Sequence, residues 1–234
     1  MVVVDENLVE VDETRTPASL VFIGHVDAGK STISGQLMFL TGIVDMRTIQ
    51  KYKEEAKEKG RDSWWLAYVM DINEEEKAKG KTVEVGRACF DTKTKRFTIF
   101  DAPGHKNYVP NMMMGAAMAD YACLVISAKR GEFESGFDMD GQTREHAQLA
   151  KSLGVKNLII AVNKMDEPTV KWSKDRFQEI KDKLSVFLNN TGFDLEKDIV
   201  WLPCSALNSD NIKEPVDKKV CNWYNGPTLF EIFD

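Results

Sequence analysis

The sequence has few of the residues that mark disulfide-rich and metal-binding proteins. Its 234 residues include four cysteines and three histidines, with no CxxC pair and no histidine at ligand spacing. A disulfide framework or a zinc site is therefore not expected. Cys123 and Cys204 lie within or beside apolar runs, so we expect them to be small core residues of a cytoplasmic protein, since thiols stay reduced in the cytosol.

Long apolar runs and an excess of basic residues are lacking as well. No run approaches the ~20 residues that span a membrane, and residues 1–17 are acidic where a signal peptide would be basic. The formal net charge of −6 argues against a general grip on nucleic acid and against sequence-specific DNA binding, because such contacts need a basic face. With 43% hydrophobic and 29% charged residues, the chain is expected to fold as a soluble globule without a membrane partner.

Short apolar runs recur along the chain, each with room for a helix before the next, as in an α/β fold. The runs are nearly continuous rather than alternating, which is typical of strands buried on both faces of a largely parallel sheet with helices on both sides. We expect such strands at 20–23, 97–100, 122–126, 158–162 and 199–202. A helix is expected between Ser173, as its N-cap, and Gly192, as its stop, because apolar residues recur there at helical spacing.

The acidic residues 1–17 lack helical periodicity. We expect them to form an extended leader that pairs with a sheet edge or stays loose. The core is expected to begin at Ala18 or Ser19, and residues 18–234 to form one domain, because no repeat, proline-rich linker or low-complexity segment interrupts them.

The first expected strand runs into GHVDAGKST at residues 24–32, which fits the GxxxxGK[ST] pattern of a phosphate-binding loop and then opens a helical pattern. Such glycines let consecutive backbone N–H groups point at phosphate oxygens, and the helix adds its positive end. Lys30 would supply a charge to the outer phosphates, and the Ser31 hydroxyl would bind Mg²⁺. The predicted phosphate-binding residues of this loop are Val26, Asp27, Ala28, Gly29, Lys30, Ser31 and Thr32.

A second motif, DAPGH at residues 101–105, follows a later strand. The Asp101 carboxylate would hold Mg²⁺, usually through water, and the N–H of Gly104 would meet a γ-phosphate. Such a turn alone is as often structural as functional. The functional interpretation depends on its position, one strand after the phosphate loop. Together the two motifs predict a sensor for the third phosphate.

A third motif, NKMD at residues 163–166, again ends an apolar strand. The Asp166 carboxylate would accept hydrogen bonds from N1–H and the exocyclic amine of guanine, whereas adenine offers no such pair of donors. Asn163 would brace the loop, and the stem of Lys164 would lie across the ring. The motif therefore favours GTP or GDP over ATP.

The last motif, Ser205-Ala206-Leu207, gains weight only from following NKMD. A backbone N–H near Ala206 would meet guanine O6. The four loops would converge at strand carboxyl ends, where open α/β sheets bind ligands, so the sequence predicts a P-loop NTPase. Two alternatives stay open: an ATP-using P-loop enzyme such as a kinase, for which Asp166 is the discriminating residue, and a module that holds nucleotide without useful hydrolysis.

In this order the motifs resemble those of translational GTPases. Further stretches at 80–88, 101–117, 126–137 and 141–147 (GKTVEVGRA, DAPGHKNYVPNMMMGAA, ISAKRGEFESGF and GQTREHA) look most like the class II peptide chain release factors, the GTPase subunits of eukaryotic translation termination. The resemblance implies ribosome-stimulated hydrolysis of GTP in support of stop-codon-dependent peptide release. Ribosome-rescue GTPases of no-go decay and aminoacyl-tRNA-carrying elongation factors are the alternatives.

The resemblance also implies roles for two further residues. Thr82 would join Ser31 on Mg²⁺ when GTP is bound, and His105 would orient the attacking water. Switch I would span about 44–85 and switch II about 101–118. Elongation factors place an aliphatic residue before the switch threonine, where it shields the water-positioning histidine. This chain has Lys81 at that position, so the shielding of His105 is expected to differ.

The resemblance bears on domains and partners too. Relatives carry two β-barrel domains after the GTPase domain, and the farther barrel docks the stop-codon-reading class I release factor. This sequence ends at Asp234, so we expect a fragment without those barrels that is a monomer in isolation and whose partners are the ribosome and, mainly through the missing domains, the class I factor.

Residues 44–81 break the α/β rhythm. They are rich in Lys and Glu, carry Trp64, Trp65 and Tyr68, and are too long for an idle loop. We expect helices within the first switch, with the aromatic side chains covering apolar surface. Whether this span changes with the nucleotide or is a fixed decoration stays open.

Overall fold

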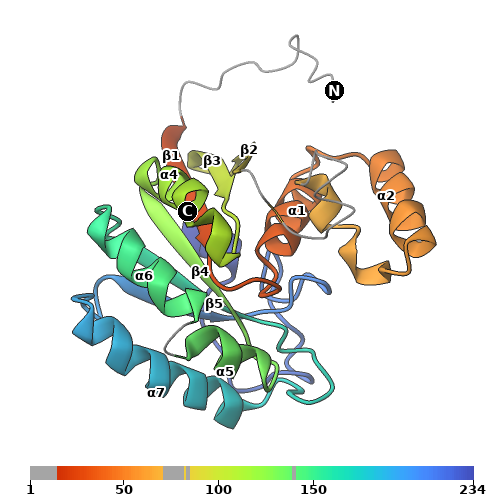
Figure 1. Ribbon diagram of the computed structural model, residues 1–234. Helices are drawn as coiled ribbons and strands as arrows, with labels where there is room; N and C mark the ends of the chain where they lie inside the picture. Colours follow the sequence, from red (N-terminus) through yellow and green to blue (C-terminus); the bar gives the residue numbers. More distant parts are fainter. Residues whose placement is uncertain (1–14, 71–81, 83–84, 139–140) are drawn as a thin grey trace.

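The architecture is a three-layered α/β fold built on one sheet (Figure 1). The computed structural model describes residues 15–70, 82, 85–138 and 141–234. The strand order is β2-β3-β1-β4-β5-β6, and neighbours run parallel except β2, which is antiparallel to β3. The strand bounds are β1 Thr16–Ile23, β2 Gly86–Asp91, β3 Lys95–Asp101, β4 Tyr121–Ser127, β5 Asn157–Asn163 and β6 Ile199–Pro203.

The central strands are buried on both faces. Burial is nearly unbroken along β4 and β5, and successive side chains of a strand point to opposite faces. In β1, Val21 and Ile23 belong to one apolar core, whereas Leu20 and Phe22 belong to the other. The strands expected from continuous apolar runs are confirmed, because each run lies within one parallel strand of the sheet.

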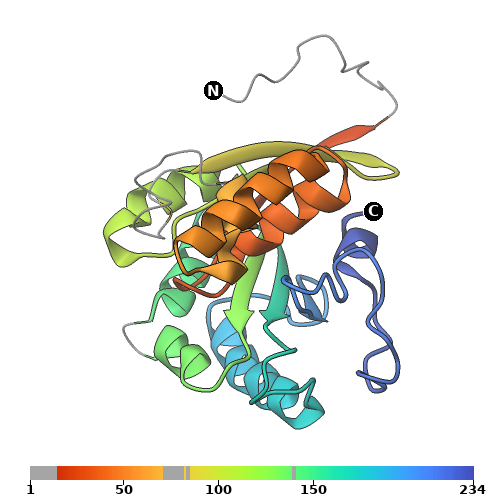
Figure 2. The same cartoon turned by 90° about the vertical axis from the view of Figure 1, so that its right-hand side faces the viewer.

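Helices cover both faces, and Figure 2 shows α1 and α2 in front of the sheet. Side chains of α1 and α8 contribute to the core that contains Leu20, and side chains of α4, α6 and α7 to the core that contains Val21. The expected P-loop NTPase architecture is confirmed. The helix bounds are α1 Lys30–Leu40, α2 Met46–Glu58, α4 Val109–Ala117, α5 Glu132–Phe137, α6 Gln142–Ser152, α7 Lys174–Asn190 and α8 Leu229–Phe233, and the 3₁₀ turns are η1 Asp62–Trp64, η2 Ala67–Val69 and η3 Lys106–Tyr108.

The helix expected after Ser173 is α7. The Ser173 Oγ accepts a hydrogen bond from the backbone N–H of Arg176 at 3.2 Å, which caps the helix. Gly192 follows the C-cap with φ of +93°, a left-handed conformation that favours glycine. The buried face of α7 holds the apolar residues that predicted it, Phe177, Ile180, Leu184 and Leu188.

Two features of the sheet differ from expectation. β1 begins at Thr16, before the expected strand at 20–23, because Thr16 and Pro17 pair with Lys95 and Arg96 of β3, and both of these first residues are exposed. The other is β2, an antiparallel edge strand that was not expected because it contains no continuous apolar run. Residues 1–14 of the expected leader lie outside the described residues.

The described part of the span after α1 contains helix α2 and the 3₁₀ turns η1 and η2. Its helix α2 is capped by Asp45, whose Oδ1 accepts from the backbone N–H of Thr48 at 2.7 Å. The backbone of Leu66 lies so close to Gly35 of α1 that a Cβ there would collide with its carbonyl oxygen. Helices were expected in this span and are confirmed up to residue 70, while residues 71–81, including Lys81, lie outside the described part of the chain.

The aromatic residues of this span have different environments. Tyr68 is buried, and Trp65 packs edge-on against Phe39 of α1 with ring centroids 6.3 Å apart. These two cover apolar surface as expected.

The core also contains Cys123 and Cys204, as expected. Among the described helices, none is long and apolar enough to cross a membrane.

Candidate nucleotide site

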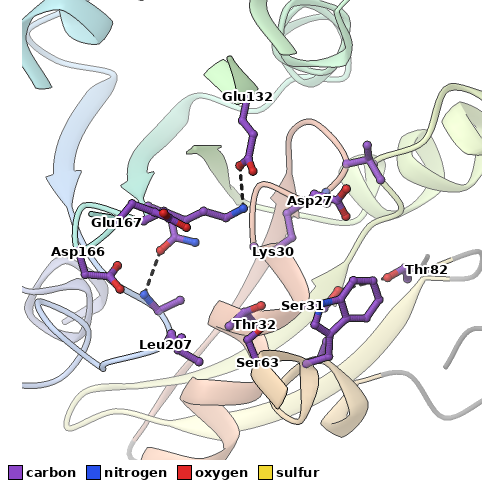
Figure 3. Close-up of a pocket in the computed structure, with 18 of the residues that line it drawn as sticks. Asp27, Lys30, Ser31, Thr32, Ser63, Thr82, Glu132, Asp166, Glu167 and Leu207 are labelled. Atoms are coloured by element: carbon purple, nitrogen blue, oxygen red, sulfur yellow. Dashed lines mark hydrogen bonds and ion pairs between the residues drawn. The ribbon is translucent and has the colours of Figure 1, made fainter. Parts of the chain in front are cut away.

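The four predicted loops meet in one cavity of about 360 Å³ (Figure 3). They follow β1, β3, β5 and β6, so the cavity lies at the carboxyl ends of these strands. The predicted site residues in its lining are Val26, Asp27, Gly29, Lys30, Ser31, Thr32, Thr82, Gly104, His105, Asn163, Lys164, Asp166, Ala206 and Leu207. The structure places Ala28, Asp101 and Ser205 outside this lining, buried in the surrounding core.

The phosphate loop curls through two glycines in conformations that other residues rarely adopt. Gly24 and Gly29 have φ of +133° and +100°, and a Cβ on Gly24 would collide with the backbone carbonyl of Val125. α1 begins at Lys30, so the positive end of the helix lines the cavity. A Cβ on Gly104 would collide with Lys30 Nζ, so the second motif packs directly against this loop.

Lys30 is buried beneath the loop, and its Nζ donates to the carbonyl of His25 at 2.8 Å. Burial lowers the pKa of this amine to about 8, an effect that the carboxylates of Asp101 and Asp27 partly offset. A phosphate group in the cavity would supply further negative charge, so Lys30 is suited to bind an anion.

Three oxygen-bearing side chains lie near the amino end of α1. Ser31 Oγ is 3.2 Å from Thr82 Oγ1, and Asp101 is buried at the end of β3. Hydroxyl and carboxylate oxygens are hard ligands, so this set fits Mg²⁺. In the described part of the chain, no group of three or more His, Cys, Asp or Glu is arranged to hold a metal, so Mg²⁺ would need phosphate oxygens and water for much of its shell.

His105 follows Gly104 and caps η3. Its Nδ1 accepts a hydrogen bond from the backbone N–H of Asn107 at 3.3 Å, and its ring lies 5.8 Å from that of Tyr108, centroid to centroid. Because Nδ1 is used by the backbone, Nε2 is the nitrogen that can serve a molecule in the cavity.

Asn163 connects three of the loops. Its Nδ2 donates to the carbonyl of Ala28 at 3.0 Å, and its Oδ1 accepts from the backbone N–H of Ala206 at 2.9 Å. Asn163 is itself buried, so both contacts are shielded from water. The N–H of Ala206, which the sequence placed near guanine O6, is thereby engaged with Asn163 in this structure.

Asp166 stands at the other end of the cavity. Its Oδ2 accepts a hydrogen bond from Asn208 Nδ2 at 3.3 Å, while the buried Ser205 Oγ accepts from the backbone N–H of Asn208, also at 3.3 Å. Asn208 therefore ties the last loop to the Asp166 carboxylate. Leu207 also lines the cavity, and its side chain is exposed.

The cavity also contains residues that the motifs did not reveal. They are Ser63, Trp64, Ala67, Glu132 and Glu167. Trp64 comes from the span after α1, where its ring was expected to cover apolar surface; it lines the cavity instead, with the Arg61 guanidinium 4.6 Å from the ring centroid. Glu132 lies in the EFESGF stretch, which carried the family resemblance but no assigned role. Glu167 directly follows the NKMD motif in the sequence. The other four come from elements outside the motifs and reach the cavity through tertiary packing.

A further unpredicted support is His146 of α6. Its Nδ1 accepts a hydrogen bond from the backbone N–H of Gly24 at 3.0 Å, at the start of the phosphate loop. Burial, and then the charges of Lys30 and His25, lower the pKa of His146 to about 3. The ring is therefore neutral at physiological pH, as an accepting nitrogen must be.

A glycine-containing loop between a parallel strand and a helix, with a buried lysine and paired hydroxyls, defines a P-loop nucleotide-binding domain. The chain belongs to the family described as the elongation factor Tu GTP binding domain, whose model matches residues 16–233. The family resemblance of the motifs is thereby confirmed.

Two similar curated proteins are GTP-binding subunits of release factors. The chain is 53% identical over 232 residues to the eukaryotic peptide chain release factor GTP-binding subunit of Schizosaccharomyces pombe, covering 99% of this chain and 35% of that protein. It is 56% identical over 231 residues to the Dictyostelium discoideum protein of the same name, covering 98% of this chain and 41% of that one. The chain thus spans well under half the length of these relatives.

Solved structures agree with the fold. A crystal structure of sup35 complexed with GDP is 41% identical with a TM-score of 0.71, covering 99% of this chain and 47% of that one. The GTPase-like domain of Saccharomyces cerevisiae Ski7 bound to GTP is 23% identical with a TM-score of 0.83, covering 94% of this chain and 50% of that one. The second likeness supports the fold alone.

Proposed function

We propose that this chain is the GTP-binding and GTP-hydrolysing domain of a translation termination factor that assists stop-codon-dependent peptide release on the ribosome. The observation that carries the proposal is its identity of 53% and 56%, over nearly the whole chain, to GTP-binding subunits of release factors. The cavity supports it, since Lys30, Ser31 and Asp166 surround a space of suitable size for a nucleotide.

The phosphate end of the ligand would lie at the amino end of α1. The backbone N–H groups of residues 26–32 and the charge of Lys30 would neutralise the phosphate oxygens. Ser31, Thr82 and Asp101 would hold Mg²⁺, directly or through water, and the ion supplies charge stabilisation to the transferring phosphoryl group. The N–H of Gly104, packed against Lys30, would contact the γ-phosphate.

The guanine would lie between the third and fourth loops. The Asp166 carboxylate would accept from N1–H and the exocyclic amine, and Asn163 would hold the two loops together. Since the Ala206 N–H is engaged with Asn163, the neighbouring N–H of Leu207 is our candidate donor to O6. Adenine would leave the Asp166 carboxylate without its paired donors, which disfavours ATP.

Hydrolysis would depend on positioning. His105 would orient the attacking water through Nε2, since Nδ1 is engaged with Asn107. Thr82 of switch I and Gly104 of switch II would make their contacts with Mg²⁺ and the γ-phosphate only when GTP is bound, so the two switch regions would distinguish GTP from GDP. We expect slow turnover in isolation and stimulation by the ribosome. The partners would be the ribosome and a class I release factor, the latter mainly through parts of the longer relatives outside this chain, and the place of action the cytoplasm.

The base assignment is tested by competition of GTP, GDP and ATP for fluorescent GDP bound to the chain, with and without Mg²⁺. We expect GTP and GDP to displace the probe and ATP to fail at the same concentrations. Displacement by ATP at GTP-like concentrations would support a kinase-like P-loop enzyme instead.

The termination role is tested in a chain extended to the length of the relatives. With ribosomes and a class I factor, this protein should hydrolyse GTP in a stop-codon-dependent way, and His105→Ala should abolish that hydrolysis while keeping nucleotide affinity. Stimulation by stalled ribosomes alone would favour a rescue factor, and stimulation by aminoacyl-tRNA delivery an elongation factor. Binding without any stimulated turnover would indicate a module that holds nucleotide for structure.

A further inference from the structure

Glu132 is an acidic residue in the wall of the cavity that we propose to bind polyphosphate, and no step of that function uses it. It is the first residue of α5 and lines the cavity together with Lys30 and Lys164. An anion beside a phosphate site opposes phosphate binding unless its charge is compensated. Its contacts reveal the compensation.

The carboxylate of Glu132 is held by three donors. Its Oε2 accepts from Lys164 Nζ and from Ser127 Oγ, each at 2.7 Å, and its Oε1 lies 3.0 Å from Lys129 Nζ. Burial raises the pKa of this carboxyl, but the hydrogen bonds from Lys164, Ser127 and Lys129 outweigh it and lower the pKa to about 2. Glu132 is therefore ionised at neutral pH.

Lys164 connects this carboxylate to the base site. It lies in the third loop between Asn163 and Asp166, with a backbone φ of +61°. The dashed line from Glu132 in Figure 3 marks its ion pair with the Lys164 amine. The side chains of Lys164 and Glu132 are 26% and 31% exposed, so the pair is partly shielded from water. A lysine stem loses conformational entropy when it is ordered over a ligand, and an ion pair formed beforehand removes much of that loss from the binding step.

We propose that Glu132 is a positioning residue for guanine recognition, which anchors the amine of Lys164 so that the aliphatic stem of Lys164 lies ready across the purine ring. This inference rests on the proposed function and deepens it. Glu132 itself contacts neither base nor phosphate and acts through Lys164. Its effect is therefore the same for guanine nucleotides with one phosphate or two.

The experiment measures affinities and release rates of GMP and GDP for the unmodified chain, Glu132→Ala, Glu132→Gln, Lys164→Ala and the Glu132→Ala/Lys164→Ala double variant. Glu134→Gln is the matched control, because Glu134 lies on the same helix and pairs with Arg176 at 2.9 Å but does not line the cavity. Thermal unfolding of each variant checks the fold.

We expect Glu132→Ala to lower the affinities for GMP and GDP by the same factor, about tenfold, and to speed the release of both nucleotides. Glu132→Gln should show a smaller loss, and Glu134→Gln none. In the Lys164→Ala background, Glu132→Ala should change affinity less than about twofold, because the coupled partner is gone.

Three results would overturn the inference. They are unchanged guanine-nucleotide affinity in both Glu132 variants, additive losses in the double variant, and a gain in GDP affinity relative to GMP affinity when the charge is removed, which would make Glu132 a simple electrostatic opponent of phosphate. Failure of the unmodified chain to bind GDP would overturn the proposed function, and this inference with it.

Discussion

The side chain of Asn163 donates to the carbonyl of Ala28, 3.0 Å away, and so joins the loop after β5 to the phosphate loop after β1. A Cβ on Gly29 would collide with the same amide group, which shows how closely the two loops approach. The phosphate and base sides of the cavity are therefore connected directly at this point. Any change in Asn163 is expected to affect both the phosphate and the base side.

Asn163→Ala is expected to destabilise the folded chain and to lower its affinity for GDP. It leaves the Ala28 carbonyl and the Ala206 N–H, both buried, without their partner, which should lower the free energy of unfolding by about 2 kcal/mol or more. Urea denaturation and GDP titration measure the two effects. Asn157→Ala, at the exposed start of the same strand, is the control and should change stability by less than about 0.5 kcal/mol. Equal stabilities of Asn163→Ala and the unmodified chain would show that the two hydrogen bonds of Asn163 contribute nothing to folding.

Asp166→Asn should shift the base preference from guanine to xanthine. The side-chain amide donates where the carboxylate accepted, and it suits the second carbonyl of xanthine. We expect the affinity for GDP to fall about 100-fold or more, and xanthosine diphosphate to bind more tightly than GDP. Competition against a fluorescent diphosphate measures the preference. Glu167→Gln removes a neighbouring charge from the same lining and should keep guanine preferred, whereas retained preference in Asp166→Asn would remove Asp166 from base recognition.

Nucleotide affinity should fall as the pH rises above 8. Lys30 in the free chain has a pKa of about 8, and bound phosphates raise it, so binding above pH 8 takes up a proton. The GDP dissociation constant should then increase between pH 8 and 9.5, with a limiting slope of tenfold per pH unit by linkage. Guanosine, which lacks phosphates, controls for titration of the base itself. A GDP profile parallel to that of guanosine would contradict the role of Lys30.

His146 should make the folded state sensitive to acid. Its pKa is lowered from 6.5 to about 3 by burial, so between these values the unfolded chain binds more protons and stability falls as the pH falls. Relative to His146→Asn, whose Oδ1 keeps an acceptor for the Gly24 N–H, the unmodified chain should lose about 1.4 kcal/mol per pH unit below pH 6.5. Urea denaturation at several pH values measures the difference. Parallel curves for the two chains would show that His146 does not titrate as described.

Much of the fold was predictable because the parallel strands are buried on both faces. Continuous apolar runs such as 122–126 and 158–162 fall within β4 and β5, and the cap at Ser173 is local chemistry. β2 was not predictable in this way, because its half-buried pattern carries no continuous run. The early start of β1 depends on pairing with β3, a neighbour far away in the sequence.

The sequence by itself determined the phosphate loop, the order of the four motifs and the parallel sheet that carries them, because each depends on residue types at short, fixed spacings. Only the tertiary structure decided that Glu132 pairs with Lys164, that His146 supports Gly24, and that Trp64 reaches the cavity wall. These contacts join residues from separate elements, and their existence depends on how helices pack against the sheet, which no local pattern encodes.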